Sequence, residues 1–438
     1  MKKSKAIISL LLVLVMALSL VSLIACNDND NEVELVMWAP SGAQTFYSEW
    51  AKKWAEEYNK SEAANGKTYI VIMGIEAEKT AATQMKNLGA DGADVFCFVD
   101  DQMDTLLDAK LLSLLGNPDN ENAILARDIA ARNTAGSVAA ARGEDGNLYA
   151  FPMQADNTYF LFYDPNIISE SELTTWDNIF EKVTAYNTAH KTNYRVQIDL
   201  GDPWYQSSFF YAFGGTASKT ETNFSTDDVG LKALKTAHKM AMEPLLKVVP
   251  ANDLPKEFDK SSQKIAVGVG GPFVYTEVKE KNPDIKVAPL PKFVYENQKY
   301  QMIPFLSNKL IGVNDLSKDR VAARDLANFM TSEAVQKDKM VKLSAGPSNI
   351  NAANSTGSAT TSEIAAVLAA QSTYSIPQLN LPKGYWEAIK TPVNAVKTAG
   401  ALADRNKDTY YKDGVYQDAE LRKLLTAMYT AMELETAK

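Results

Sequence analysis

The 438-residue sequence predicts an α/β protein built from two lobes. Strand-like and helix-like segments alternate over the first part of the chain, and this alternation builds a parallel sheet with right-handed crossovers. About 410 residues remain after the N-terminal segment, which is more than one hydrophobic core normally serves, so two domains are expected.

The N-terminal segment is typical of a secretory signal peptide. Three lysines within the first five residues precede an apolar run over residues 10–18, and small residues lead up to Ala25. The apolar run is too short to cross a bilayer comfortably and has no stop-transfer flank, which disfavours a transmembrane helix. We therefore expect residues 1–25 to be a signal peptide that is removed on export.

The end of this segment reads Leu-Ile-Ala-Cys at residues 23–26, which resembles the lipobox of bacterial lipoproteins. The resemblance implies that Cys26 becomes the mature N-terminus and carries acyl chains such as palmitate. Two or more chains, at about 0.8 kcal/mol for each buried methylene, hold a protein stably at a membrane. Residues 26–32 would then be the lipidated cysteine and a polar tether, and the protein would be anchored outside the cytoplasm to the bacterial cell membrane.

The predicted mature chain is acidic. The sequence has 45 basic and 54 acidic side chains, and the signal peptide carries three of the lysines and no acid, which leaves a formal charge of −12. Such a charge disfavours nucleic acid and anionic lipid as partners. Cys97 lies in an apolar run at residues 95–99, where a lone cysteine is expected to be a small buried hydrophobe.

The first lobe is predicted from three strands, each followed by a helix. The strands are expected at residues 33–38, 69–75 and 93–99, and the helices at residues 44–58, 79–88 and 101–112. In open parallel sheets, ligands bind beyond the carboxyl ends of the strands. We therefore expect the loops at residues 38–44 and 98–102 to contact a ligand.

The chain is predicted to cross between the lobes more than once. Strand-like residues 149–152 and 159–163 bracket a segment that suits a crossing strand, and the apolar alternation over residues 302–313, with a helix at 319–329, indicates a return to the first lobe. The expected first lobe is 33–154 plus 307–350. The expected second lobe is 155–306 plus 351–438.

The second lobe repeats the alternation of helices and strands. Helices are expected at residues 175–191, 204–213 and 228–242, and strands at 195–200, 265–269 and 285–289. Residues 351–362 are rich in Ser, Thr, Asn and Ala and are predicted to be a loop, and the remainder of the chain is predicted to be mostly helical.

Short motifs follow one another along the chain in an order that matches a known family. They are Phe98 with Asp101 and Gln102, then Asp202-Pro203-Trp204, then Gly271-Pro272-Phe273, and finally Pro377-Gln378 with Tyr385 and Trp386. In this order and spacing they resemble the extracellular solute-binding protein family 1, and within it the maltose/maltodextrin-binding proteins. The resemblance covers about residues 34 to 400.

The resemblance implies a periplasmic-binding-protein-like fold, in which two α/β lobes close about a hinge on a ligand in the interlobe cleft. It implies a substrate-binding protein of an ABC-type sugar importer, with an oligosaccharide such as maltodextrin as ligand and the importer membrane subunits as partners. We expect a monomer that needs no cofactor and no metal.

The resemblance also implies a set of sugar-binding residues. Four aromatic positions match the family's stacking platforms: Phe98, Trp204, Phe273 and Trp386, with Tyr385 beside the last. The matching polar positions are Ser41, Gln44, Asp101, Gln102, Asp202 and Lys390, together with Asp156 or Asn157. The family's acid in the first loop is absent, Gln102 and Lys390 replace arginines, and we therefore expect a shifted sugar preference.

Sugar chemistry explains why these residue types occur together. A pyranose has a rim of hydroxyls and an apolar C–H face, so its site needs bidentate acceptors for the rim and flat aromatics for the face. Several aromatic platforms in a row favour an oligosaccharide over a monosaccharide. Asp202 has a second interpretation, because an aspartate before Pro203 is also a natural helix N-cap.

Two other classes of protein remain open at this point. A glycoside hydrolase needs two carboxylates flanking the scissile bond, for which Asp156 and Asp202 are the candidates. A surface adhesin that shares the fold would bind no small ligand. The two histidines, His190 and His238, both fall in helical stretches, which disfavours acyl-transfer chemistry and a histidine metal site.

Overall fold

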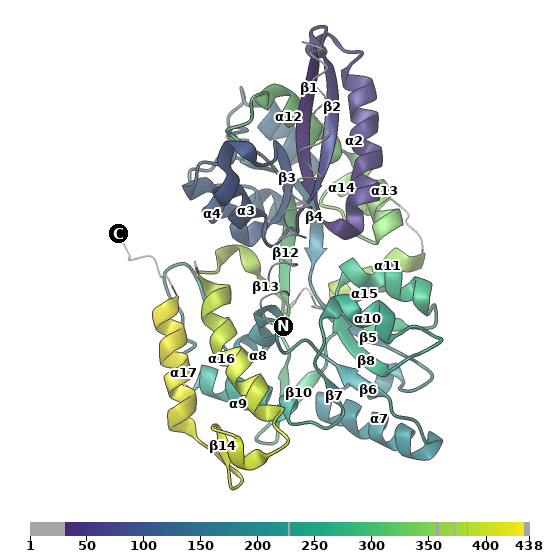
Figure 1. Ribbon diagram of the computed structural model, residues 1–438, viewed down its shortest axis with the longest axis vertical. Helices are drawn as coiled ribbons and strands as arrows, with labels where there is room; N and C mark the ends of the chain where they lie inside the picture. The colour runs from purple at the N-terminus through teal and green to yellow at the C-terminus, as the bar shows by residue number, and fades with distance from the viewer. Residues whose placement is uncertain (1–30, 227, 356–358, 372, 383, 433–438) are drawn as a thin grey trace, which may run out of the picture.

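A computed structural model describes residues 31–226, 228–355, 359–371, 373–382 and 384–432. The expected signal peptide, Cys26 and most of the tether lie outside the described residues. Figure 1 shows two units stacked along the long axis, which we call the upper and the lower unit, each with its own sheet. Each unit also has its own hydrophobic core. The upper core draws on residues between Leu35 and Met153 and between Leu310 and Val335, and the lower core on residues between Tyr159 and Phe305 and between Ile364 and Met432.

The upper sheet is formed by six strands: β1 (Glu32–Ala39), β2 (Thr68–Ile75), β3 (Val95–Val99), β4 (Ala150–Asn157), β12 (Phe305–Val313) and β13 (Ile376–Pro377). Its order is β13-β12-β3-β1-β2, and β4 also pairs with β12. Strand β1 is parallel to β2 and β3, which confirms the parallel arrangement predicted for the first three strands. The sheet as a whole is mixed, because β12 returns from the lower unit and runs antiparallel to β3 and β4.

Eight helices of the described chain belong to the upper unit: α2 (Gln44–Tyr58), α3 (Ala81–Leu88), α4 (Met103–Asp108), α5 (Ile124–Arg132), α6 (Ala135–Ala140), α12 (Arg320–Met330), α13 (Glu333–Leu343) and α14 (Ile350–Asn354). Helix α2 has the predicted bounds and buries Phe46 and Trp54 against the sheet. The helix predicted at residues 101–112 is shorter, since a 3₁₀ turn (Asp100–Gln102) precedes α4 and α4 ends at Asp108.

The lower sheet has the order β7-β6-β8-β5-β9. Its strands are β5 (Phe160–Tyr163), β6 (Arg195–Gln197), β7 (Leu246–Lys247), β8 (Ile265–Gly270) and β9 (Lys286–Ala288). The helices that accompany it are α7 (Trp176–His190), α8 (Pro203–Ala212), α9 (Val229–Ala241), α10 (Leu254–Glu257), α11 (Pro272–Lys281), α15 (Ala359–Gln371), α16 (Tyr385–Gly400) and α17 (Asp418–Ala431). Two hairpins complete it: β10 (Lys292–Tyr295) with β11 (Gln298–Gln301), and β14 (Tyr411–Lys412) with β15 (Val415–Tyr416).

The chain passes between the units along β4 and β12 (Figure 1). Strand β4 pairs with β12 in the upper sheet, and after two further residues β5 joins the lower sheet. Strand β12 begins beside β13 and continues up to its pairing with β3. These strands therefore connect the two units covalently.

One sequence-based expectation is wrong. Residues 351–362 were expected to form a loop, but α14 and α15 cover much of this segment. The small polar residues that suggested a loop are interspersed with alanine, which has the highest helix propensity, and the contacts of α14 with α13 favour the helix.

Two further features of the described residues concern membranes and thiols. No helix among them is long and apolar enough to cross a membrane. Cys97 is buried on β3, as expected, and burial raises the pKa of its thiol to about 12, so the thiol is unreactive at neutral pH.

Candidate functional site

The candidate site lies where the upper and the lower unit meet. The 3₁₀ turn that follows β3 contributes Asp101 from the upper unit, and the start of α16 contributes Trp386 from the lower unit. The indole Nε1 of Trp386 donates a hydrogen bond of 2.6 Å to Asp101 Oδ2. A second contact joins the β2–α3 connection to the loop before α8, where Lys79 Nζ lies 3.9 Å from Asp202 Oδ2.

We call the residues at this meeting point the junction site, defined as Asp101, Asp202, Trp204, Phe273, Gln378 and Trp386. Asp101 follows the carboxyl end of β3, Asp202 and Trp204 follow β6, and Phe273 follows β8, whereas Gln378 and Trp386 follow β13 of the upper sheet. The carboxyl ends of strands are the position expected for a ligand in α/β proteins.

Three aromatic rings of the junction site are incompletely buried. Trp204 and Trp386 are half-buried, and Phe273 is 40% exposed. The Trp204 ring centroid lies 6.3 Å from that of Phe273 and 4.7 Å from that of Tyr159. These rings therefore retain free apolar surface, which is what stacking against a sugar face requires.

Helix α8 holds Trp204 in place from its first turn. Asp202 is the N-cap, its Oδ1 accepts a hydrogen bond of 2.9 Å from the Trp204 backbone N–H, and Pro203 occupies the first helical position. Asp202 therefore has the capping role that the sequence offered as its second interpretation. Its Oδ2 faces Lys79, and about a third of its side chain remains exposed.

One carboxylate and one amide connect the two tryptophans. Gln378 Oε1 accepts a hydrogen bond of 3.1 Å from Trp204 Nε1, and Asp101 accepts hydrogen bonds from both Trp386 and Gln378. Burial raises the pKa of Asp101, and these two donors partly offset the rise. Gln378 was not predicted as a site residue, although the Pro377-Gln378 motif that precedes Trp386 was a usable signal.

Two predicted aromatic contacts are buried and belong to the cores. Phe98 is fully buried on β3 and packs on Phe96, with ring centroids 5.6 Å apart. Tyr385 is 1% exposed, and its hydroxyl lies 3.0 Å from Ser207 Oγ. Phe98 is therefore not a stacking platform in this arrangement, because both faces of β3 are covered and every residue of the strand is buried.

The two glutamines predicted to contact sugar use their amide groups within the protein. Gln44 Nε2 donates to the carbonyls of Ala39 and Gly74. Gln102 is buried, and it accepts a hydrogen bond from the Ala82 N–H at the start of α3 and donates one to the Glu78 carbonyl. Both side chains therefore fix the loops around the site.

Asp156 and Asn157 lie on the crossing strand β4 and are both buried. Asp156 accepts hydrogen bonds from Gln154 Nε2 at 2.6 Å and from the Gly346 N–H at 2.5 Å, and burial raises its pKa. Asn157 Nδ2 donates to Ser307 Oγ on the neighbouring strand β12 at 2.6 Å. The side chains of both residues thus tie the crossing strand to its neighbours.

The last two predicted residues lie on the surface. Ser41 is exposed in the 3₁₀ turn after β1. Lys390 is exposed on α16, one turn beyond Trp386, and its Nζ lies 3.1 Å from Glu387 Oε1. Both side chains are therefore exposed to solvent.

An ion pair that the sequence did not predict connects the crossing strand β12 to the β2–α3 connection. Lys309 Nζ lies 2.6 Å from Glu78 Oε2, and the two side chains are only 13% and 10% exposed. The partners are far apart in the sequence, and no local pattern signals such a pair.

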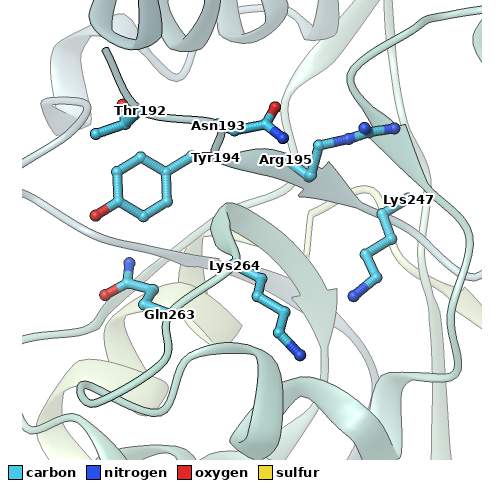
Figure 2. Close-up of a pocket in the computed structure, with 7 residues that line it drawn as sticks. All are labelled: Thr192, Asn193, Tyr194, Arg195, Lys247, Gln263 and Lys264. Carbon is cyan, nitrogen blue, oxygen red and sulfur yellow. The ribbon is translucent and has the colours of Figure 1, made fainter. Parts of the chain in front are cut away.

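A separate pocket of about 580 Å³ lies in the lower unit and is lined by Thr192, Asn193, Tyr194, Arg195, Lys247, Gln263 and Lys264. Figure 2 shows that Lys247 and Lys264 extend on the same side of it. The pocket lies at the amino ends of β6 and β8, whereas the junction site follows the carboxyl ends. Arg195 donates to two backbone carbonyls and Lys247 is paired with Glu257, so these cations are already engaged.

The described residues contain no group of three or more His, Cys, Asp or Glu side chains arranged to hold a metal ion. The junction site itself offers aromatic faces, carboxylates and one amide.

Comparison with known proteins finds similarity over most of the chain. A galactooligosaccharide-binding protein of Bacillus subtilis (strain 168) is 25% identical over 348 residues, which cover 74% of this chain and 78% of that protein. A maltose/maltodextrin-binding domain from Bdellovibrio bacteriovorus, solved with maltotriose, superposes with a TM-score of 0.72 at 15% identity, over 91% of this chain and 99% of that one. A maltodextrin-binding protein from L. casei BL23 gives a TM-score of 0.67 at 17% identity, over 92% and 99% of the two chains.

The two structural matches show that the chain shares the two-lobed fold of these proteins. The family model described as bacterial extracellular solute-binding protein matches residues 53–370, well over half of the chain. This chain therefore belongs to the bacterial extracellular solute-binding proteins.

Proposed function

We propose that this chain is the substrate-binding lipoprotein of an ABC-type carbohydrate importer and that it binds an oligosaccharide between its two units. The observation that carries the proposal is the junction site, where the lower unit presents three incompletely buried aromatic rings and one of them, Trp386, contacts Asp101 of the upper unit. A ligand held there contacts both units, so its binding free energy is available to close them.

More specifically, we propose that the oligosaccharide is a maltodextrin. Structural neighbours described as binding maltodextrin or maltotriose support it, whereas the Bacillus subtilis relative is described as binding galactooligosaccharide. Both ligands are chains of pyranoses, and both need stacking faces and hydroxyl partners. The two differ in linkage and in the orientation of one ring hydroxyl, which the polar rim of a site discriminates.

Family members of this kind are binding proteins and not enzymes. The glycosidase alternative also has little chemical support here, because Asp156 is buried and both of its oxygens accept hydrogen bonds within the protein. A general acid or nucleophile must reach the scissile bond.

The titration that tests the proposal uses the signal-free protein, beginning at Asn27, against maltotriose, a galactotriose, a xylo-oligosaccharide and a tripeptide. Isothermal calorimetry is expected to give a dissociation constant near micromolar, roughly −8 kcal/mol, for one saccharide of the panel and no heat for the peptide. The recovered saccharide should carry no new reducing ends. An absence of heat with every saccharide contradicts the proposal and favours an adhesin.

The lipid anchor is a separate part of the proposal, supported by the lipobox-like residues 23–26. We propose that Cys26 is acylated and holds the protein outside the cytoplasm at the cell membrane. Bacteria fed a labelled palmitate analogue are expected to label the full chain, and Cys26→Ser is expected to abolish the label and release the protein from the membrane fraction. Label that persists in this variant would contradict acylation at Cys26.

A further inference from the structure

A hairpin-like loop of the lower unit reaches the upper unit at Asp104, which follows Asp101 of the junction site by three positions in the sequence. It spans residues 216–223, between α8 and α9, and Phe224 anchors it in the lower core. The Ser218 N–H donates to the Glu221 carbonyl at 2.8 Å, and the Asn223 N–H donates to the Thr216 carbonyl at 3.1 Å. Since these bonds close the loop on itself, its tip at Lys219 is held in a defined position.

Lys219 contacts two acids of the upper unit. Its Nζ lies 2.6 Å from Asp104 Oδ2 in the first turn of α4 and 3.5 Å from Glu144 Oε1 in the turn that precedes β4. The elements on either side of these acids pack into the upper core through Leu106 and Leu148. The ion pair therefore joins two units that have separate cores.

Partial burial makes the attraction between Lys219 and Asp104 stronger than that of an ordinary surface ion pair. Only 23% of the Lys219 side chain and 30% of the Asp104 side chain are exposed. Partial burial opposes the charged form of Lys219, but hydrogen bonding and charge from Asp104, together with Glu144, raise its pKa above the usual value. By contrast, Lys79, which makes another charged contact between the units, is 77% exposed and lies 3.9 Å from Asp202.

We propose that Lys219 is an interunit latch that favours the arrangement in which Asp101 and Trp386 meet, and so strengthens ligand binding without touching the ligand. An ion pair that forms in only one arrangement of the two units stabilises that arrangement. It shifts the equilibrium between the two arrangements by the free energy of the ion pair. The part of this inference that concerns ligand affinity rests on the proposed function. The part that concerns the arrangement of the units does not.

The arrangement can be measured directly with two spin labels, one on each unit. Cysteines introduced at Lys86 on α3 and Lys423 on α17 are both exposed, and the native Cys97 is buried and unreactive. Pulsed electron resonance of the signal-free protein without sugar is expected to show a longer and broader distance distribution in Lys219→Met than in the parent. Raising the salt concentration to about 1 M, where the Debye length is about 3 Å, is expected to have the same effect on the parent.

Lys239→Met is the matched control, because Lys239 pairs with Asp177 at 3.1 Å entirely within the lower unit. It should leave the distances unchanged. Exchanging the charges in Lys219→Glu with Asp104→Lys should restore the short distances that either single change loses. An unchanged distribution in Lys219→Met, or the same change in the Lys239 control, overturns the latch.

Sugar affinity provides a second readout. Lys219→Met is expected to weaken binding roughly two- to fivefold at low salt, the range for a partly exposed ion pair, and to make the affinity nearly independent of salt. If the parent binds no saccharide while the distances still change, the proposed function fails and the latch stands. If the parent binds sugar and neither affinity nor distances respond to the substitution, the latch fails and the function stands.

Discussion

Phe273 and Phe98 are both phenylalanines from the predicted set of sugar platforms, yet their environments are opposite. Phe273 is 40% exposed at the start of α11, whereas Phe98 is fully buried on β3. Phe273→Ala is therefore expected to weaken sugar binding about tenfold, ~1.4 kcal/mol, while stability changes by less than about 1 kcal/mol. Phe98→Ala should lower the free energy of unfolding by about 3–5 kcal/mol.

Calorimetric titration together with urea denaturation of both variants checks this contrast. Sugar affinity that is unaffected by Phe273→Ala would remove this residue from the site. A small stability loss in Phe98→Ala would be incompatible with a core position.

Asp100, the neighbour of the junction carboxylate, makes stability depend on pH. It is buried, its Oδ2 accepts from the backbone and side-chain N–H groups of Asn308, and burial raises its pKa to about 7. An unfolded aspartate titrates near pH 3.9, so between about pH 4 and 7 the native state binds more protons than the unfolded state. The free energy of unfolding therefore falls as the pH rises through this window.

Asp100→Asn removes this ionisation and is expected to flatten the pH dependence. Urea denaturation at about pH 5 and pH 8 measures it, and the variant should lose less stability than the parent over that interval. Burial also raises the pKa values of Asp101 and Asp156. The stability of the variant should therefore still fall with rising pH, but by a smaller amount. If the free energy of unfolding falls equally in the parent and the variant, Asp100 is not the source of the pH dependence.

At the residue scale, the sequence predicted which residues gather near the site better than it predicted what they do. The motifs pointed to Trp204 and Trp386, and the structure places both at the starts of helices. The roles of Gln102 and Asp156 as internal ties were not predictable, since they depend on which backbone groups other segments bring within reach. When the hydrogen-bond partner of a side chain is distant in the sequence, no local sequence pattern indicates it.

At the element scale, hydrophobic periodicity was a reliable guide wherever one face of an element is buried. Helix α2 matches its predicted bounds, and α7, α9 and α12 end within about two residues of theirs. Helix α14, which has only five residues, was less predictable. The antiparallel pairing of β12 was also not predicted, because it depends on the return of the chain from the lower unit.

Gly346 gives a test of how the crossing strand β4 is held. Its N–H donates to Asp156, its carbonyl accepts from the Ala155 N–H, and a Cβ at this position would lie 2.7 Å from the Asp156 side chain. Gly346→Ala is therefore expected to push the loop off β4 and to lower the free energy of unfolding by about 1–3 kcal/mol.

Gly136 on α6 is the matched control, because a Cβ there meets nothing within 4 Å. Gly136→Ala should raise stability by about 0.4–1 kcal/mol by reducing the freedom of the unfolded chain. Denaturant midpoints for the two variants should move in opposite directions. A midpoint for Gly346→Ala that matches or exceeds the parent would show that β4 does not depend on this contact.

At the scale of the whole molecule, chain length and alternating elements were sufficient to predict two α/β units with a crossing between them. Two sheets and two hydrophobic cores follow from that pattern. The contacts that join the units, such as Trp386 with Asp101 and Lys219 with Asp104, were not predictable, because each depends on how two separately folded surfaces meet.

Because the junction site draws on both units, a ligand bound there should stabilise the molecule as a whole. A ligand that binds only the native state adds RT ln(1 + [L]/Kd), about 2.7 kcal/mol at a concentration of 100 Kd. Scanning calorimetry of the signal-free protein with the saccharide selected by titration is expected to raise the Tm by a few degrees. Trp386→Ala should lose most of this rise, since it removes both a stacking face and the hydrogen bond to Asp101. The Kd of the variant should be larger, so the same sugar concentration is a smaller multiple of it. Raising the sugar concentration in proportion to the Kd should therefore restore the increase in Tm. If the Tm of the variant still does not increase, Trp386 is required for the site to form.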